Sequence, residues 1–502
     1  MGTRLERGVG DRPPAWVMPA AMAVAAMGIA LRIAAFSPLD IMHADELMQY
    51  LEQANRLATG YGIVPWEARF GLRNALIEQF LAPFLWLGGT LAPGTLLGVY
   101  LARGAFAAMT LLVLPAAWRL GALASWRHAM VALLVAAAWW ESVLFSELLL
   151  SESLASALLL LAAAPLLEEP RSRTVDQPAL RLSGFLLGLG VLVRLQYAPF
   201  AVMLALGTLR FDRARWRPVF IGGMLALLLG AASDLAMGRM PFAWMLVNVT
   251  INIGQGAANR FGISGPFAHL AGLYVHLAPV GVAVLMGALF ARRRYRPLLA
   301  AALVNLLVHS LIAHKEYRFV WLTTLTLLLL AAVTSVDLVD RIASRRARQP
   351  GGGSPAVLVL LCLVWLAASA ISQHVSGGFR AFRGGGGVPK LAIEAVEDPG
   401  ICGIGLDFEL RAHLVPSLLT RRVPIALVPL GPALHGDSLP RDLAPAVNAL
   451  ILTSPPNAAE GYHVASCRPL GASQVCLYRR AGTCRPSQAW DYQQVLDRTD
   501  KL

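Results

Sequence analysis

Residues 314–337 read HKEYRFVWLTTLTLLLLAAVTSVD, so a short polar turn leads directly into a long apolar run. The run from Phe319 to Asp337 can cross a hydrocarbon layer of roughly 30 Å as one α-helix. Apolar windows of about 18 residues or more recur along the first 372 positions. The sequence therefore predicts an all-α polytopic membrane protein.

The composition agrees with a membrane protein. Of the 502 residues 56% are hydrophobic and only 15% are charged, and the mean hydropathy is +0.58. A soluble globular chain carries roughly 25% charged residues, so the composition excludes that class.

The formal net charge of +13 comes from short basic clusters that stand between apolar windows. A nucleic-acid-binding protein would gather its basic residues on one polar face, so we expect no nucleic-acid partner. Lys and Arg are enriched in cytoplasmic loops, which places these clusters in the cytoplasm. They are Arg4, Arg7 and Arg12; Arg171, Arg173 and Arg181; Arg210, Arg213, Arg215 and Arg217; and residues 292–296 and 341–348. The first apolar segment has no clear small-residue cleavage site, so we expect it to remain as an anchor.

The apolar windows predict about eleven spans. Arg194 interrupts segment 182–208, which lies between two basic loops, so we expect two short helices there that enter and leave on the same side. An apolar stretch at 78–92 is expected either to lie in the membrane interface or to enter the membrane partway. The other spans are predicted at roughly 15–36, 95–117, 128–146, 149–166, 218–236, 267–290, 297–313, 319–337 and 355–372.

With the N-terminus inside, alternation of these spans places four segments on the outer face. The segments are 37–77, 147–152, 234–266 and 314–318. Every motif with possible chemistry falls in or beside one of them. We therefore expect a catalytic domain over residues 1–372, with its site on the outer face.

Residues 373–502 have ordinary polarity, short apolar runs and many prolines, which predicts a small mixed α/β outer domain. Four of the five cysteines lie here, and an even number outside the cytoplasm favours one or two disulfides. Free thiols and a metal site are the alternatives, and four cysteines allow three pairings. The four are Cys402, Cys467, Cys476 and Cys484.

The first outer segment carries His43-Ala44-Asp45-Glu46 directly after a span, followed by Trp66-Glu67 and by Arg73. A lone acid in such a loop would be explained by solvation. A carboxylate at the mouth of a membrane cavity can instead act as general base towards a sugar hydroxyl that attacks an anomeric carbon. One base is enough, and a single displacement inverts that carbon.

The turn His314-Lys315-Glu316-Tyr317-Arg318-Phe319 collects three potentially cationic side chains and one acid between two spans. Cations at a membrane boundary often only anchor a helix. The same residues can also hold a phosphate, which Arg grips with two hydrogen bonds. Arg194 is a second candidate phosphate ligand, and its alternative is a structural ion pair with Glu147 or Glu152.

These motifs resemble glycosyltransferase family 22, the polyprenyl-phosphate-mannose-dependent mannosyltransferases. The first block, with Gln49, Tyr61-Gly62, Pro65-Trp66-Glu67 and Gly71-Leu72-Arg73, looks like the family's His-Pro-Asp-Glu, Thr-Trp-Glu and Gly-Leu-Arg signature. The second matches its His-Lys-Glu-x-Arg-Phe motif. Asp234, Gly238, Pro241 and Asn248 resemble a third landmark between them.

The resemblance implies a GT-C fold and an inverting transfer of a hexose, most often mannose, to a glycan or glycolipid acceptor. The donor would be a polyprenyl-phosphate sugar, with no metal or cofactor required. It implies Asp45 as the catalytic base with Glu46 beside it, and His314, Lys315, Arg318 and Arg194 at the donor phosphate. Supporting or acceptor positions would be His43, Trp66, Glu67, Arg73 and Asp234.

The sequence departs from the family pattern at Ala44, at Met237 and at Arg194-Leu195-Gln196. The tail beyond residue 373 resembles the extension of bacterial relatives, which implies an inner-membrane protein whose site and C-terminal domain face the periplasm. Three other functions remain open. They are a flippase for a lipid-linked sugar, a related GT-C enzyme that transfers aminoarabinose or an oligosaccharide, and a membrane scaffold.

Overall fold

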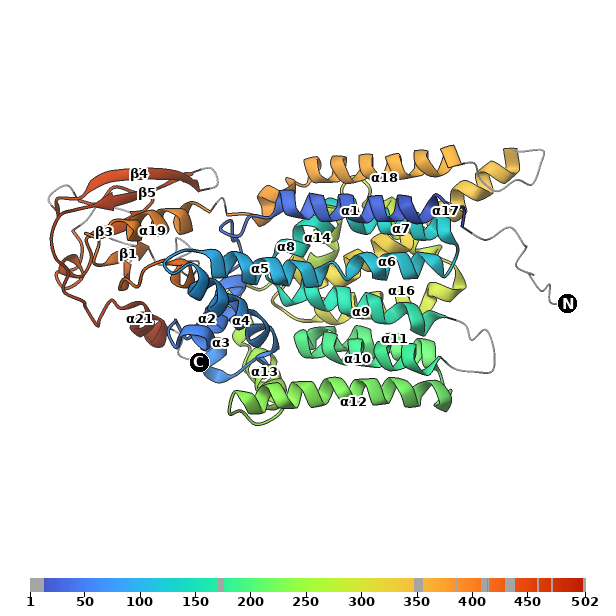
Figure 1. Ribbon diagram of the computed structural model, residues 1–502, viewed down its shortest axis with the longest axis horizontal. Helices are drawn as coiled ribbons and strands as arrows, with labels where there is room; N and C mark the ends of the chain where they lie inside the picture. The colour runs from blue at the N-terminus through green and yellow to red at the C-terminus, as the bar shows by residue number, and fades with distance from the viewer. Residues whose placement is uncertain are drawn as a thin grey trace.

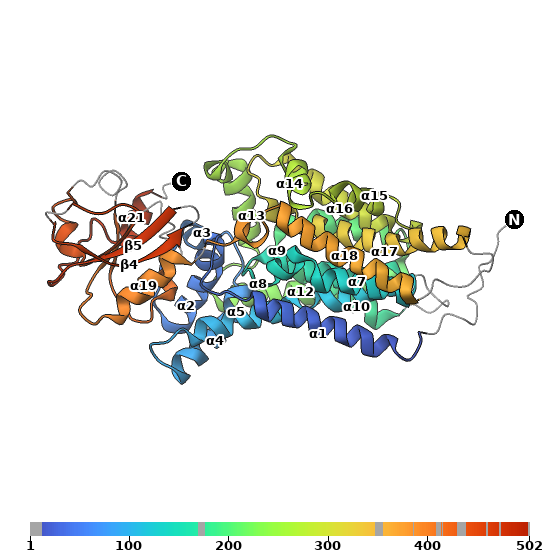
Figure 2. The same cartoon turned by 90° about the horizontal axis from the view of Figure 1, so that it is seen from above.

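A bundle of long helices and a smaller C-terminal domain make up the protein (Figure 1). The C-terminal domain caps one end of the bundle, which we call the domain end, and helix α1 (Val17–Ala35) begins at the opposite end (Figures 1 and 2). The computed structural model describes residues 13–168, 176–346, 355–384, 386–407, 413, 415–428, 438–457, 460–470 and 473–499. The basic residues predicted at 4–12, at 171 and 173, and at 347–348 lie outside this range.

The bundle helices run back and forth between the two ends, as the alternation of apolar windows and polar loops requires (Figure 1). They are α1 (Val17–Ala35), α5 (Leu97–Thr110), α6 (Val113–Ala122), α7 (Trp126–Ala138), α8 (Trp140–Glu147), α9 (Ser151–Leu167), α10 (Gln177–Val193), α11 (Ala198–Leu209), α12 (Arg213–Ala236), α14 (Ala268–His276), α15 (Gly281–Leu289), α16 (Arg296–Leu311), α17 (Trp321–Arg346) and α18 (Pro355–Val375).

Within the described residues, five helices are long and apolar enough to span a membrane, or up to seven when two bent pairs count as one span each. Shorter apolar helices such as α9 and α10 alternate with them, which is consistent with the predicted number of spans. The protein is an integral membrane protein with the predicted helical fold.

Two predicted spans are not single helices. Residues 268–289 form two helices bent by 110°, and Pro279 lies in the break because it has no N–H to continue a helix. The segment predicted at 128–146 bends by 55° between α7 and α8. Arg32 of α1 donates hydrogen bonds of 2.9 Å to the carbonyls of Ala136 and Ala137, so it satisfies groups that the bend releases.

Segment 182–208 forms the predicted pair of helices, α10 and α11, which join through a short 3₁₀ turn at Leu195–Tyr197. The turn lies at the domain end, so Arg194 is placed near the end of the bundle rather than at its middle (Figure 1). Asp176 caps the start of α10 by accepting from the Ala179 amide.

The segment after α1 folds over the domain end. It forms a π-helical turn at Glu46–Leu51, then α2 (Glu52–Thr59) and α3 (Trp66–Phe70), and it continues into the apolar helix α4 (Leu76–Leu91). The segment after α12 contributes α13 (Ala243–Val249) to the same end (Figure 1).

The C-terminal domain is the predicted small α/β unit. Its five-stranded sheet has the order β2-β1-β3-β5-β4, with β2, β1 and β3 parallel and the last two pairings antiparallel. Helices α19 (Gly387–Glu397) and α21 (Tyr492–Thr499) pack on it. The strands are β1 (Ile404–Asp407), β2 (Ile425–Val428), β3 (Ala449–Leu452), β4 (His463–Leu470) and β5 (Ser473–Arg479).

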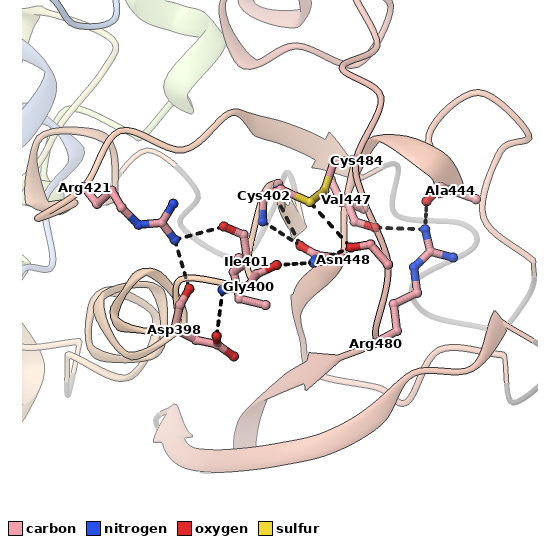
Figure 3. Close-up of a disulfide and its surroundings, with 12 residues drawn as sticks. Asp398, Gly400, Ile401, Cys402, Arg421, Ala444, Val447, Asn448, Arg480 and Cys484 are labelled. Carbon is pink, nitrogen blue, oxygen red and sulfur yellow. Dashed lines mark hydrogen bonds between the residues drawn. A yellow bond between two sulfur atoms is a disulfide. The ribbon is translucent and has the colours of Figure 1, made fainter.

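Two disulfides, Cys402–Cys484 and Cys467–Cys476, use all four cysteines of this domain. The expectation of disulfides is thus confirmed, with the pairing that the sequence left open. Asn448 supports the first one, because its side chain accepts from the Cys402 amide at 2.9 Å and donates to the Gly400 and Gly482 carbonyls (Figure 3).

We expect the Cys402–Cys484 disulfide to stabilise the domain more than the Cys467–Cys476 disulfide, because it closes a loop of 82 residues rather than 9. Loop-closure entropy predicts losses of about 4.5 and about 2.5 kcal/mol when the pairs are replaced by serine. Thermal unfolding of the two double variants in detergent measures this order. Equal losses, or a larger loss for the short loop, would contradict it.

Candidate active site

A cavity of about 350 Å³ lies at the domain end, where segments distant in sequence meet. Its walls come from the segment after α1, the α10–α11 turn, the α13 region, the turn before α17, and the C-terminal domain. The charged lining residues are Asp45, Glu67, Arg73, Arg194, Glu316 and Arg318; the remaining lining residues include Trp66, Asn248, Phe261, His309, His314, Phe319, His413, Tyr492 and Leu496.

The two predicted motifs meet directly in this cavity. The Arg318 guanidinium donates to an Asp45 carboxylate oxygen at 2.5 Å across 273 positions of sequence. It also donates to Glu316 through Nε at 2.6 Å, and its NH1 lies 3.5 Å from Glu152. One guanidinium therefore holds three carboxylates, and Asp45 occupies a position at which an anionic ligand could bind Arg318.

Asp45 is a strongly acidic carboxyl in this state. Burial acts to raise the pKa of Asp45, but the positive charge of Arg318, together with that of Arg73, outweighs burial and lowers this pKa to about 2. The Arg318 charge likewise overcomes burial at Glu316 and lowers the pKa of that carboxyl. Both groups are carboxylates at neutral pH.

Arg194 reaches the same cluster from the α10–α11 turn. Its NH1 lies 3.2 Å from Glu152 and 3.2 Å from the Ser151 hydroxyl, and its guanidinium stands 5.1 Å from the centre of the Phe319 ring. The ion pair with Glu152, one of the two structural alternatives, is therefore present, and Arg194 also lines the cavity. Glu152 bridges the two arginines while it is almost completely buried.

Trp66, Glu67 and Arg73 form the opposite wall. Arg73 donates to Glu67 at 3.2 Å and lies 3.4 Å from the Tyr50 hydroxyl. Burial raises the pKa of Glu67 despite the neighbouring Arg73. Trp66 stacks against Phe261 at 6.1 Å between ring centres, so an aromatic surface borders the charged groups.

The three other predicted residues of the two motifs differ in their placement. His314 lines the cavity, and its two ring nitrogens lie 3.1 Å from Glu316 and 3.1 Å from the Gly262 carbonyl. Lys315 donates to the Ser264 and Ile312 carbonyls instead. The Nδ1 atom of His43 lies 3.7 Å from a Glu316 carboxylate oxygen. Burial, together with the positive charge of Arg318, lowers the pKa of His43.

Glu46, predicted beside the base, does not line the cavity. Adjacent helical residues point in directions about 100° apart, so Asp45 faces the cavity while Glu46 faces the bundle. Its carboxylate is completely buried, accepts from Arg103 at 2.8 Å and from the Leu149 amide at 3.0 Å, and holds α5 and the α8–α9 turn against the first segment.

Asp234 is also outside the cavity lining. It is buried at the end of α12, where it accepts from the Phe242 amide at 2.8 Å and closes the turn before α13. Gly238 in this turn has φ of 65°, which favours glycine. Asp234 thus acts on the cavity through the placement of α13, whose Asn248 is a lining residue.

We expect Arg103→Ala to lower the stability of the fold by about 3–5 kcal/mol, because it leaves the Glu46 carboxylate buried without its counter-charge. The double variant Glu46→Gln with Arg103→Met removes both charges and should recover part of the unfolding temperature. A Glu46→Gln protein that keeps its unfolding temperature but loses catalysis would contradict a structural role for Glu46.

Comparison with known proteins identifies the family of this chain. The model of the Alg9-like mannosyltransferase family matches residues 24–382. This range contains both motifs and all the residues that line the cavity except those of the C-terminal domain. The chain belongs to this family. No curated protein matches the chain.

The family member has a GT-C fold. It is similar to the crystal structures of ArnT from Cupriavidus metallidurans, one bound to undecaprenyl phosphate and one in the apo state. The identities are 14% and 13% and the TM-scores 0.55 and 0.56, and each comparison covers 94% of this chain and 100% of ArnT. The protein is therefore an integral membrane glycosyltransferase.

Sequence reasoning did not assign a role in the site to Glu152, Phe261, Tyr492 or His413. Glu152 lies in an apolar run, where a buried acid signals a partner of opposite charge. Tyr492 and His413 come from the C-terminal domain, more than 90 positions after the second motif and more than 360 after the first, so no local signal connects them with either motif.

Proposed function

We propose that this glycosyltransferase transfers a hexose, most favourably mannose, from a polyprenyl-phosphate sugar to a glycan or glycolipid, with inversion at the anomeric carbon. The proposal includes an inner-membrane location and a cavity that opens to the periplasm. The observation that carries it is the pairing of Asp45 with Arg318 in a cavity that Arg194 also lines.

The donor phosphate is proposed to bind at Arg318 and Arg194, with His314 as a further donor. Guanidinium groups bind phosphate oxygens with two parallel hydrogen bonds and offset the charge that develops on the leaving group. For this reason we propose that transfer requires no metal ion. The similar fold of ArnT, crystallised with undecaprenyl phosphate, supports a polyprenyl-phosphate donor.

Donor binding would also change Asp45. The phosphate competes for Arg318, so the carboxylate loses its counter-charge while it remains in a partly buried site. Both effects raise the proton affinity of Asp45 and convert a weak base into one that can accept a proton.

The proposed step is a single displacement. Asp45 takes the proton of the acceptor hydroxyl as that oxygen forms a bond to the anomeric carbon. The bond between this carbon and the phosphate oxygen breaks, and its electron pair leaves with the polyprenyl phosphate. The proton on Asp45 then returns to solvent. Trp66 and Phe261 offer the ring faces on which sugars commonly stack, so we place the sugars beside them.

We expect Asp45→Asn to lower the transfer rate by about 10²–10⁴-fold, since it removes the proposed general base. The assay uses purified protein, polyprenyl-phosphate mannose and extracted membrane lipids, and it measures transferred mannose. Asp212→Asn is a matched control, because Asp212 caps α12 at the opposite end and Asn caps a helix equally well.

Full activity of Asp45→Asn would remove the base assignment. Parallel assays use polyprenyl-phosphate donors of glucose and aminoarabinose, because they test the identity of the sugar separately from the transfer itself. A wild type that transfers none of these sugars would contradict the proposed function.

The pH dependence of the two kinetic parameters should differ. In the free enzyme the pKa of Asp45 is about 2, so kcat/KM should show no acid limb from this group above roughly pH 4. In the donor complex the raised pKa should bring an acid limb of kcat to higher pH. Rate measurements from acid to neutral pH test this difference, and coincident acid limbs would contradict the release of Asp45.

A further inference from the structure

A second cavity, of about 270 Å³, lies next to the catalytic one, between the α4–α5 hairpin and the C-terminal domain. We call it the hairpin groove. Tyr492 lines both cavities, so the two are adjacent at this residue. The π-helical turn that carries Asp45 continues directly into α2, which forms one wall of the groove. The groove therefore borders the base side of the catalytic cavity.

One wall of the hairpin groove is apolar. It comes from Leu85 and Gly89 of α4, together with Leu96 and Val99 at the start of α5. The outer surface of α4 is also apolar, because Trp86 is 58% and Leu91 67% exposed. An exposed Trp beside exposed Leu is typical of a helix at the membrane–water interface. The apolar wall is thus placed where a lipid chain can reach it.

The other wall is polar and contains basic and acidic residues, which are Arg421 and Arg422 together with Glu52 and Asp491. The Arg422 guanidinium lies over the ring of Tyr61, 4.6 Å from its centre, and both line the groove. Within the described residues Arg422 has no carboxylate at ion-pair distance, whereas Arg421 beside it donates to three backbone carbonyls. Tyr61 is half exposed. Asn55, Thr59 and Thr420 add further hydrogen-bonding groups.

We propose that the hairpin groove binds the lipid-proximal part of an amphipathic glycolipid acceptor. The acyl chain would lie on the α4–α5 wall, and the anionic or hydroxyl-rich headgroup on Arg422 and Tyr61. The glycan end would pass Tyr492 to reach Asp45. This proposal rests on the proposed function, and it names the acceptor class and the route by which the acceptor enters.

Because one wall of the groove is apolar and the other is polar, the groove differs from a packing defect between domains. Defects in protein interiors are small and apolar and are seldom lined by a guanidinium on a half-exposed aromatic ring. The donor lipid is a less suitable occupant, because the proposed phosphate ligands Arg318 and Arg194 come from the turn before α17 and the α10–α11 turn, and neither element lines the groove.

The experiment fills the groove with a side chain. Gly89 lines it, and a Cβ atom at this position would meet nothing within 4 Å, so Gly89→Phe fits without a backbone clash. Gly104→Phe is the matched control, because Gly104 on α5 has equally open space and does not line the groove. Arg422→Gln is a second, surface variant that removes the headgroup cation.

The acceptors are membrane lipids extracted from the native cells, intact or deacylated by mild alkali, with polyprenyl-phosphate mannose as donor. We expect Gly89→Phe to raise KM for intact lipids by about tenfold or more, equivalent to about 1.4 kcal/mol. Its KM for donor and for deacylated acceptor should stay unchanged, as should every parameter of Gly104→Phe. Arg422→Gln should raise the acceptor KM for intact lipids alone or for both forms.

Equal acceptor KM values for Gly89→Phe and the wild type would overturn the proposal, as would an increase in donor KM, which would assign the groove to the donor chain. The proposal would also be overturned if the wild type had the same KM for the deacylated acceptor as for the intact lipid. Such results leave the proposed function standing, because they require transfer. Its own failure shows as an absence of sugar transfer by the wild type to either acceptor.

Discussion

The ion pair between Arg318 and Asp45 is the interaction on which the rest of the active site depends. A guanidinium at the boundary of a membrane bundle must have partners, because a buried unpaired charge is costly. Arg318 obtains them from three segments, which are the turn before α17, the π-helical turn after α1 and the start of α9. Each segment must therefore end at the domain end of the bundle, and the alternation of the spans meets this condition.

The pairing of these arginines with carboxylates also determines how the site can bind an anionic ligand. Without a ligand, carboxylates occupy Arg318 and Arg194, so the site is preorganised and each guanidinium is already desolvated and oriented. An anionic ligand then exchanges with Asp45 and does not have to order a flexible cation. In the proposed mechanism, this arrangement would couple donor binding to the activation of the base and would limit proton transfer to the donor-bound site.

Hydropathy and charge predicted the helical fold, the Arg194 break and the meeting of the two motifs at one end, because these depend on patterns of many residues. They could not predict which of Asp45 and Glu46 faces the cavity, since a rotation of one residue decides it and the π-helical turn alters the phase. The sequence predicts a single span at 267–290 and not the bend, because a continuous apolar run carries no signal for a break within it. Glu152 was named only as a partner for Arg194, and its contact with Arg318 depends on tertiary packing.

The C-terminal domain contributes to the cavity through contacts that sequence cannot reveal. Gln493 of α21 exchanges two hydrogen bonds with the Val64 backbone, at 2.8 and 3.1 Å, and Asp497 pairs with Arg69. These contacts join positions 429 and 428 apart and fix α21 beside the Trp66 wall. The C-terminal domain is therefore part of the site.

The most direct test of the exchange at Arg318 is the affinity for polyprenyl monophosphate, measured as a Kd for the wild type and for Asp45→Asn. If the ligand phosphate and the Asp45 carboxylate compete for Arg318, removal of the carboxylate charge should lower the Kd by about tenfold, while Asp212→Asn leaves it unchanged. An unchanged or higher Kd for Asp45→Asn would show that the phosphate does not take the position of Asp45, and it would contradict the account.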